Sequence, residues 1–184
     1  MYGKTLIKSG ITFIIASLIF MSINTVYAEI DSYKYDVSLS NLIVSNIKEN
    51  YVQFNQEAND YKSNLDEVYE SFDFYLEEFN TKNPIVLSKI DNVNKTLEKL
   101  EDASYNMYKY CIYNINNEET KSMCSTFKTN YLGIVNSYKK MLEDYNNIIK
   151  QYNNYAEYKE ELEKVDLMEV KLPNTMKLLN EKIA

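Results

Sequence analysis

The most constraining feature of the sequence is a run of mostly apolar and aromatic residues spaced three or four apart, from Val44 to Phe79. This spacing follows the a and d positions of five consecutive heptads, which is a strong signal for a long helix packed against other helices. The positions, in order, are Val44, Ile47, Tyr51, Phe54, Ala58, Tyr61, Leu65, Val68, Phe72, Tyr75 and Phe79. A long amphipathic helix is therefore expected in this region.

The heptad phase breaks twice, at residues 80–84 and 114–121. At the first break Asn83 suits a helix N-cap and Pro84 suits the first helical position. At the second, Asn116 or Asn117 would cap a third helix, with Glu118 and Glu119 in its first turn near the positive end of the helix dipole. We therefore predict an all-α fold, an elongated antiparallel three-helix bundle over 38–166 with helices at about 38–80, 84–115 and 118–165.

The two flanks of the bundle carry weaker patterns. Residues 29–37 are expected to form an extended leader. In the tail, residues 167–184, Pro173 would end the long helix, and Met176, Leu179 and Ile183 would form a short amphipathic helix. We expect this short helix to fold back on the bundle, and docking to a partner is the alternative.

The N-terminus has the pattern of a secretory signal peptide. Lys4 and Lys8 precede an apolar run over residues 11–23, and the small residues Val26 and Ala28 stand at positions −3 and −1. We expect cleavage after Ala28, so that residues 1–28 are removed; an uncleaved segment that anchors the chain in a membrane is the alternative. Because this segment holds two lysines and no acid, cleavage changes the formal charge from −7 to −9. That charge argues against nucleic acids and anionic membrane surfaces as partners.

Cys111 and Cys124 are the only cysteines, and both occupy core positions of the heptad pattern, symmetrically about the second predicted turn. In an exported chain this placement predicts a disulfide that joins two facing helices, worth about 3 kcal/mol for a loop of this length. Two buried thiols and a redox or metal role are the alternatives.

Composition excludes much chemistry. The chain has no His and no Trp, and its 20 basic residues are all lysine. Without His there is no imidazole base, no Ser-His or Cys-His nucleophile and no His-ligated metal. Paired acids such as Glu77 and Glu78 resemble solvated helix faces. We therefore expect no enzyme activity, no cofactor and no metal. The heavy use of Asn, Lys, Ile and Tyr resembles that of a low-GC Gram-positive bacterium.

The tyrosines form two groups. Four of them repeat every seven residues and are expected in the core, with an exposed aromatic strip as the alternative: Tyr131, Tyr138, Tyr145 and Tyr152. Four others cluster before the second turn, where not all can face inward, and form the candidate contact surface: Tyr105, Tyr108, Tyr110 and Tyr113.

The combined pattern favours an exported, non-enzymatic helical protein, secreted or associated with the cell envelope, that acts by contact with a protein partner. It would be an adaptor or scaffold of a surface or secretion assembly, with no stable membrane insertion after signal cleavage. A secreted effector or toxin-like helical protein is one alternative, and a carrier of a small apolar ligand is another. A continuous row of aromatic residues at heptad core positions can also pack against a second copy of the chain, so a homo-oligomer is a further alternative.

Overall fold

The computed structural model describes residues 37–113, 117–160 and 164–184, and the regular elements in these ranges are all helices. They are α2 (Val37–Glu70), the short 3-10 helix η1 (Leu76–Glu78), α3 (Phe79–Cys111), α4 (Glu118–Tyr158) and α5 (Asn174–Ile183). The predicted all-α class is confirmed. The predicted signal peptide, residues 1–28, and leader residues 29–36 lie outside the described residues, while Val37 already belongs to α2.

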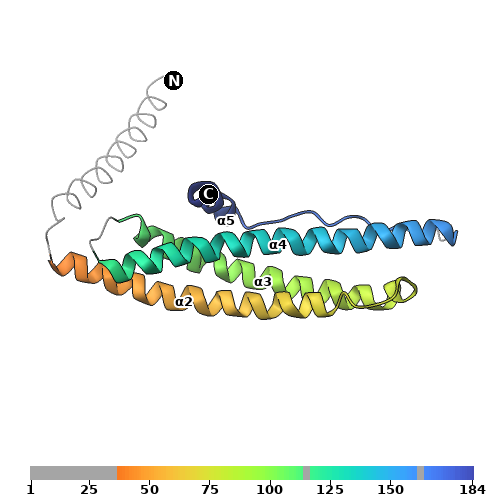
Figure 1. Ribbon diagram of the computed structural model, residues 1–184, viewed down its shortest axis with the longest axis horizontal. Coiled ribbons are helices and arrows are strands. Elements are labelled where there is room, and N and C mark those ends of the chain that lie inside the picture. Colours follow the sequence, from red (N-terminus) through yellow and green to blue (C-terminus); the bar gives the residue numbers. More distant parts are fainter. Residues whose placement is uncertain (1–36, 114–116, 161–163) are drawn as a thin grey trace, which may run out of the picture. The chain divides into compact units, whose positions relative to one another are not determined.

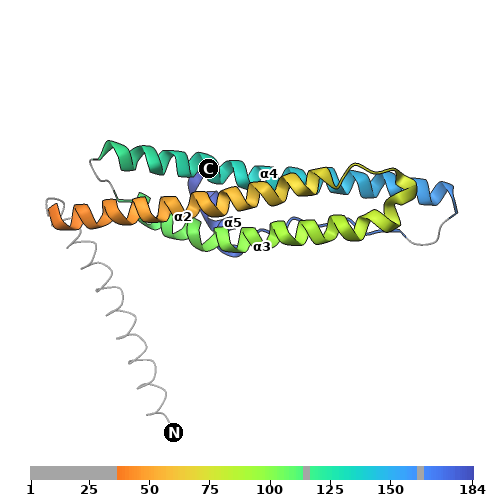
Figure 2. The ribbon, with the colours of Figure 1, turned by 90° about the horizontal axis from the view of Figure 1, so that it is seen from below.

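The chain divides into two units, Met1–Ile43 and Val44–Ala184, and the second holds α3, α4, α5 and most of α2. In this unit α2, α3 and α4 lie side by side (Figures 1 and 2). Phe54 of α2 packs edge-to-face on Phe127 of α4 with ring centroids 4.9 Å apart, and further along Tyr61 hydrogen-bonds to Ser137 at 2.9 Å. The helices form a bundle whose core is rich in aromatic side chains.

The predicted position of the first turn is wrong. α2 ends at Glu70 instead of near residue 80, and α3 begins at Phe79, before the predicted start at Pro84. The aromatic residues that extend the heptad pattern pack this turn against α4 instead of continuing a helix. Phe72 stacks on Tyr145, and Phe79 stacks on Tyr152 with ring centroids 3.9 Å apart.

Pro84 lies inside α3, in its second turn, where a proline lacks the N–H that an ordinary residue donates to the helix. Asn83 does not cap the helix. Its side-chain oxygen accepts a hydrogen bond from the Tyr145 hydroxyl, and the side chain of Asn80 accepts one from Tyr152 at 3.0 Å. Two asparagines therefore hold the first turns of α3 to α4.

The start of α4 is as expected. Asn117 is its N-cap, and the Asn117 side chain accepts a hydrogen bond from the backbone N–H of Thr120 at 3.0 Å. Glu118 and Glu119 lie in the first turn. The predicted end near residue 165 is wrong, because α4 ends at Tyr158 and Glu160 takes a left-handed conformation with φ of 58°. A residue in that conformation is a common way to end a helix.

Beyond α4, residues 164–173 form an extended segment, here called the strap, that runs back along α4 (Figure 1). Asn153 hydrogen-bonds to both the backbone N–H and the carbonyl of Val165, at 2.9 and 2.8 Å. Asn146 does the same for Met168, with both bonds at 2.7 Å. Seven helical residues rise about 10.5 Å and three extended residues span about 10 Å, so the two spacings match.

The strap leads into α5, which packs on α3 and α4 and lies across them (Figures 1 and 2). Met176 and Leu179 of α5 are buried. The Tyr131 hydroxyl donates a hydrogen bond to the Met176 carbonyl, and the Thr175 N–H donates one to the Glu101 side chain at 2.8 Å. The C-terminal segment is therefore folded back on the bundle.

Candidate functional site

The candidate site lies where α3 ends and α4 begins, and its centre is a disulfide. Cys111 is the last residue of α3, and its sulfur is bonded to that of Cys124 of α4, with the two Cα atoms 5.5 Å apart. That separation is typical of disulfides, and the predicted pairing is confirmed. The bond fixes the end of α3 against the second turn of α4.

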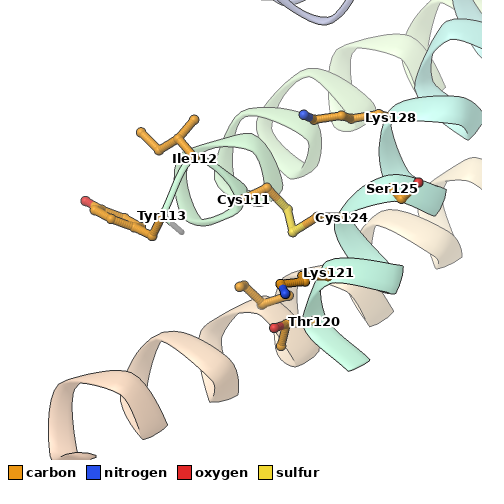
Figure 3. Close-up of a pocket in the computed structure, with 9 residues that line it drawn as sticks. Cys111, Ile112, Tyr113, Thr120, Lys121, Cys124, Ser125 and Lys128 are labelled. Carbon is orange, nitrogen blue, oxygen red and sulfur yellow. A yellow bond between two sulfur atoms is a disulfide. The ribbon is translucent and has the colours of Figure 1, made fainter. Parts of the chain in front are cut away.

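A pocket of about 410 Å³ opens beside this disulfide (Figure 3). Its lining combines apolar groups, the disulfide, hydroxyls and two lysines: Ile47, Cys111, Ile112, Tyr113, Thr120, Lys121, Cys124, Ser125 and Lys128. Figure 3 shows Lys128 and Lys121 on opposite sides of the disulfide. The two lysines are seven residues apart on α4 and therefore lie on one face of that helix.

The four tyrosines of the predicted contact surface take different positions. Tyr105 is 52% exposed, while Tyr108, Tyr110 and Tyr113 are half-buried. Only Tyr113 lines the pocket. Ile112 is the C-cap residue after α3, seven residues beyond Tyr105, and is 51% exposed. Its backbone is still helical, so it continues the helix face of Tyr105, and both residues leave large side chains in solvent.

The tyrosines of the heptad repeat are all buried, with at most 4% of any of them exposed. Each hydroxyl reaches a polar partner. The partners are the Met176 carbonyl for Tyr131, Asn94 for Tyr138, Asn83 for Tyr145 and Asn80 for Tyr152. The four rings therefore fill the core, and their hydroxyls join α4 to α3 and α5.

Burial also changes the acid–base behaviour of these groups. Desolvation raises the pKa of Tyr61, Tyr131, Tyr138 and Tyr145 above its ordinary value. The pKa of Tyr69 rises to about 12 through desolvation and its hydrogen bond to the Asp144 carboxylate. These phenols are neutral at physiological pH, and their role here is structural.

The hydrogen bonds of asparagine side chains to the tyrosines and to the strap were not predicted from the sequence, although the strap-binding asparagines carry a sequence signal. A signal was present: Tyr-Asn-Asn occurs at residues 145–147 and again at 152–154, one heptad apart. In each pair the first asparagine binds the strap and the second is exposed.

Across the described ranges, no group of three or more acidic, cysteine or histidine side chains is placed to hold a metal ion. Several of the acids form ion pairs on the surface, for example Glu119 with Lys48 at 2.7 Å and Glu157 with Lys164 at 3.0 Å. None of the helices in the described part is long and apolar enough to cross a membrane.

Comparison of the chain with protein-family models, with curated proteins and with solved structures gives no match.

Proposed function

We propose that the chain is an exported, non-enzymatic helical protein that acts by protein contact at the cell envelope, as an adaptor or scaffold of a surface or secretion assembly. In this proposal the signal peptide is removed after Ala28, and the remaining chain is an elongated antiparallel three-helix bundle with the strap and α5 attached. The contact surface is the disulfide end of α3.

The observation that carries the proposal is the combination of a disulfide and exposed large side chains at one end of a hairpin. Disulfides persist mainly in oxidising compartments, which suits export. Tyr105 of α3 and Ile112, its C-cap residue, are each about half exposed and lie seven residues apart. Tyrosine is enriched at protein interfaces, because it offers a large rigid ring and a hydroxyl.

Site-specific photo-cross-linking tests the proposal. A photoreactive phenylalanine analogue replaces Tyr105 in the full chain, expressed in its native host. The matched control carries the same analogue at Tyr75, which is 78% exposed and lies at the opposite end of α3. We expect one stoichiometric protein adduct at Tyr105 and none at Tyr75. No adduct at Tyr105, or the same adducts at both positions, would overturn the proposal.

A further inference from the structure

The pocket beside the disulfide differs in charge from the rest of the protein. The full chain carries 27 acidic residues against 20 lysines. The nine residues that line the pocket nevertheless include Lys121 and Lys128 and no acid. A second pocket, at the turn between α2 and α3, is different: its lining includes Glu70 and Asp73 as well as Lys82 and Lys89, so its charges cancel.

Lys128 makes no ion pair within the part of the chain that the structure describes. In Figure 3 its side chain extends from α4 toward α3, on the opposite side of the disulfide from Lys121. Lys121 pairs with Glu118 at 2.9 Å, but both side chains are largely exposed, and exposed pairs of this kind are weak. A bound anion can therefore compete with Glu118 for Lys121.

The remaining walls of the pocket are suited to an apolar group. Ile112, which is 51% exposed, and the disulfide supply apolar surface, while Ile47 is 2% exposed and contributes little to it. Thr120 and Ser125 add hydroxyls, which can donate hydrogen bonds to an anion. A volume of about 410 Å³ lies in the range of small-molecule sites.

We propose that this pocket binds a small organic carboxylate with an apolar body, held by the ammonium groups of Lys121 and Lys128 and by contact with Ile112 and the disulfide. Charge selects the carboxylate, because the lining offers two cations and no acid, and Glu118, which pairs with Lys121, is an exposed partner that a bound anion can displace. The apolar walls select against small inorganic anions, which would leave them in contact with water. This site goes beyond the proposed protein contact and does not depend on it.

The probe is 4-phenylbutyrate, titrated into the purified full chain with its disulfide formed and followed by isothermal titration calorimetry. The neutral 4-phenylbutanamide keeps the apolar body and removes the charge, and acetate keeps the charge and removes the body. We expect one equivalent of 4-phenylbutyrate to bind, and each analogue to bind at least tenfold more weakly. Binding of the acid and the amide with equal affinity, or no binding of the acid, would overturn the proposal.

The matched variants are Lys128→Met and Lys139→Met. Both substitutions remove an exposed lysine charge from α4 and keep an unbranched side chain, but only Lys128 lines the pocket. Loss of one charge-assisted contact should weaken binding about tenfold or more in Lys128→Met and leave Lys139→Met unchanged. Circular dichroism checks that both variants are folded. Equal affinities of the two folded variants would contradict the assignment.

The carboxylate could belong to a free acid or to the end of a polypeptide. A short peptide with a C-terminal phenylalanine, compared with 4-phenylbutyrate, separates these sources. Tighter binding of the peptide would identify a chain end, and tighter binding of 4-phenylbutyrate would identify a free acid. If neither binds, the inference is wrong.

Discussion

Replacement of Asn146 by alanine should release the strap from α4. Asn146 makes two hydrogen bonds to the backbone of Met168, and alanine removes both. Because a net hydrogen bond between neutral groups contributes about 1 kcal/mol, the loss amounts to about 2 kcal/mol. That free energy corresponds to about a thirtyfold change in the equilibrium between the attached and the detached strap.

The backbone N–H of Val165 is the best reporter of this opening. It donates to Asn153, which the substitution leaves intact. If the strap detaches as a unit, weakening its link at Met168 also increases opening at Val165. Hydrogen exchange followed by NMR should therefore show Val165 exchanging about thirtyfold faster in Asn146→Ala. The free energy of global unfolding in urea should fall by the same amount, about 2 kcal/mol, because both free energies are measured from the state with the strap attached.

The control is Asn147→Ala, which removes an exposed asparagine next to Asn146 on the same helix. Exchange at Val165 should be unchanged in this variant. Unchanged exchange at Val165 in Asn146→Ala would show that the contacts of Asn146 and Asn153 with the strap open independently, so that the strap is not one cooperative segment.

Three further predictions concern the core and the disulfide. The double variant Cys111→Ser, Cys124→Ser should lower the free energy of unfolding in urea by about 3 kcal/mol, because the unfolded chain without the cross-link has more conformational entropy. An unchanged free energy of unfolding would argue that the disulfide does not stabilise the fold. Tyr145→Phe should lower the free energy of unfolding by about 1 kcal/mol, because it removes the hydrogen bond to the Asn83 side chain. Tyr155→Phe is the control: the hydroxyl of this half-buried residue has no such bond described, so the free energy of unfolding in the same assay should not change. Above pH 10 the unfolded chain loses phenolic protons that buried tyrosines such as Tyr61 retain, since burial raises their pKa; stability is therefore complete below pH 10 and falls as pH rises further. The part of the absorbance change at 295 nm that comes from the buried tyrosines should coincide with loss of the helical circular dichroism signal, and ionisation of these tyrosines without unfolding would contradict this.

The helical class and the disulfide could be predicted because both follow from spacing. Heptad positions identify the faces that helices bury, and Cys111 and Cys124 lie symmetrically about a polar turn. The first turn was misplaced for a physical reason: Phe72 and Phe79 fit the heptad pattern and also pack a turn against α4. Spacing alone does not distinguish a buried helix position from a buried turn position.

The repeated Tyr-Asn-Asn motif marks the asparagines on α4 but not the segment that they bind, so the path of the strap could not be predicted from spacing. The pocket could not be predicted from spacing either. The strap depends on hydrogen bonds between asparagine side chains and backbone groups of Val165 and Met168, and such bonds impose no sequence pattern on the extended partner. Lys121 and Lys128 lie on one helix face and are indistinguishable in sequence from lysines on a solvated surface. The two lysines form part of a pocket only because the disulfide and Ile47, which belongs to α2, lie beside them.

We expect that this helical protein is exported and that the disulfide between Cys111 and Cys124 joins α3 to α4. Intact mass spectrometry of the protein from its native host, alkylated without reduction, tests both parts at once. We expect a chain in the medium or envelope that begins at Glu29 and carries no alkyl group at Cys111 or Cys124. A chain recovered from the cell interior with residues 1–28 still present and both cysteines alkylated would contradict it.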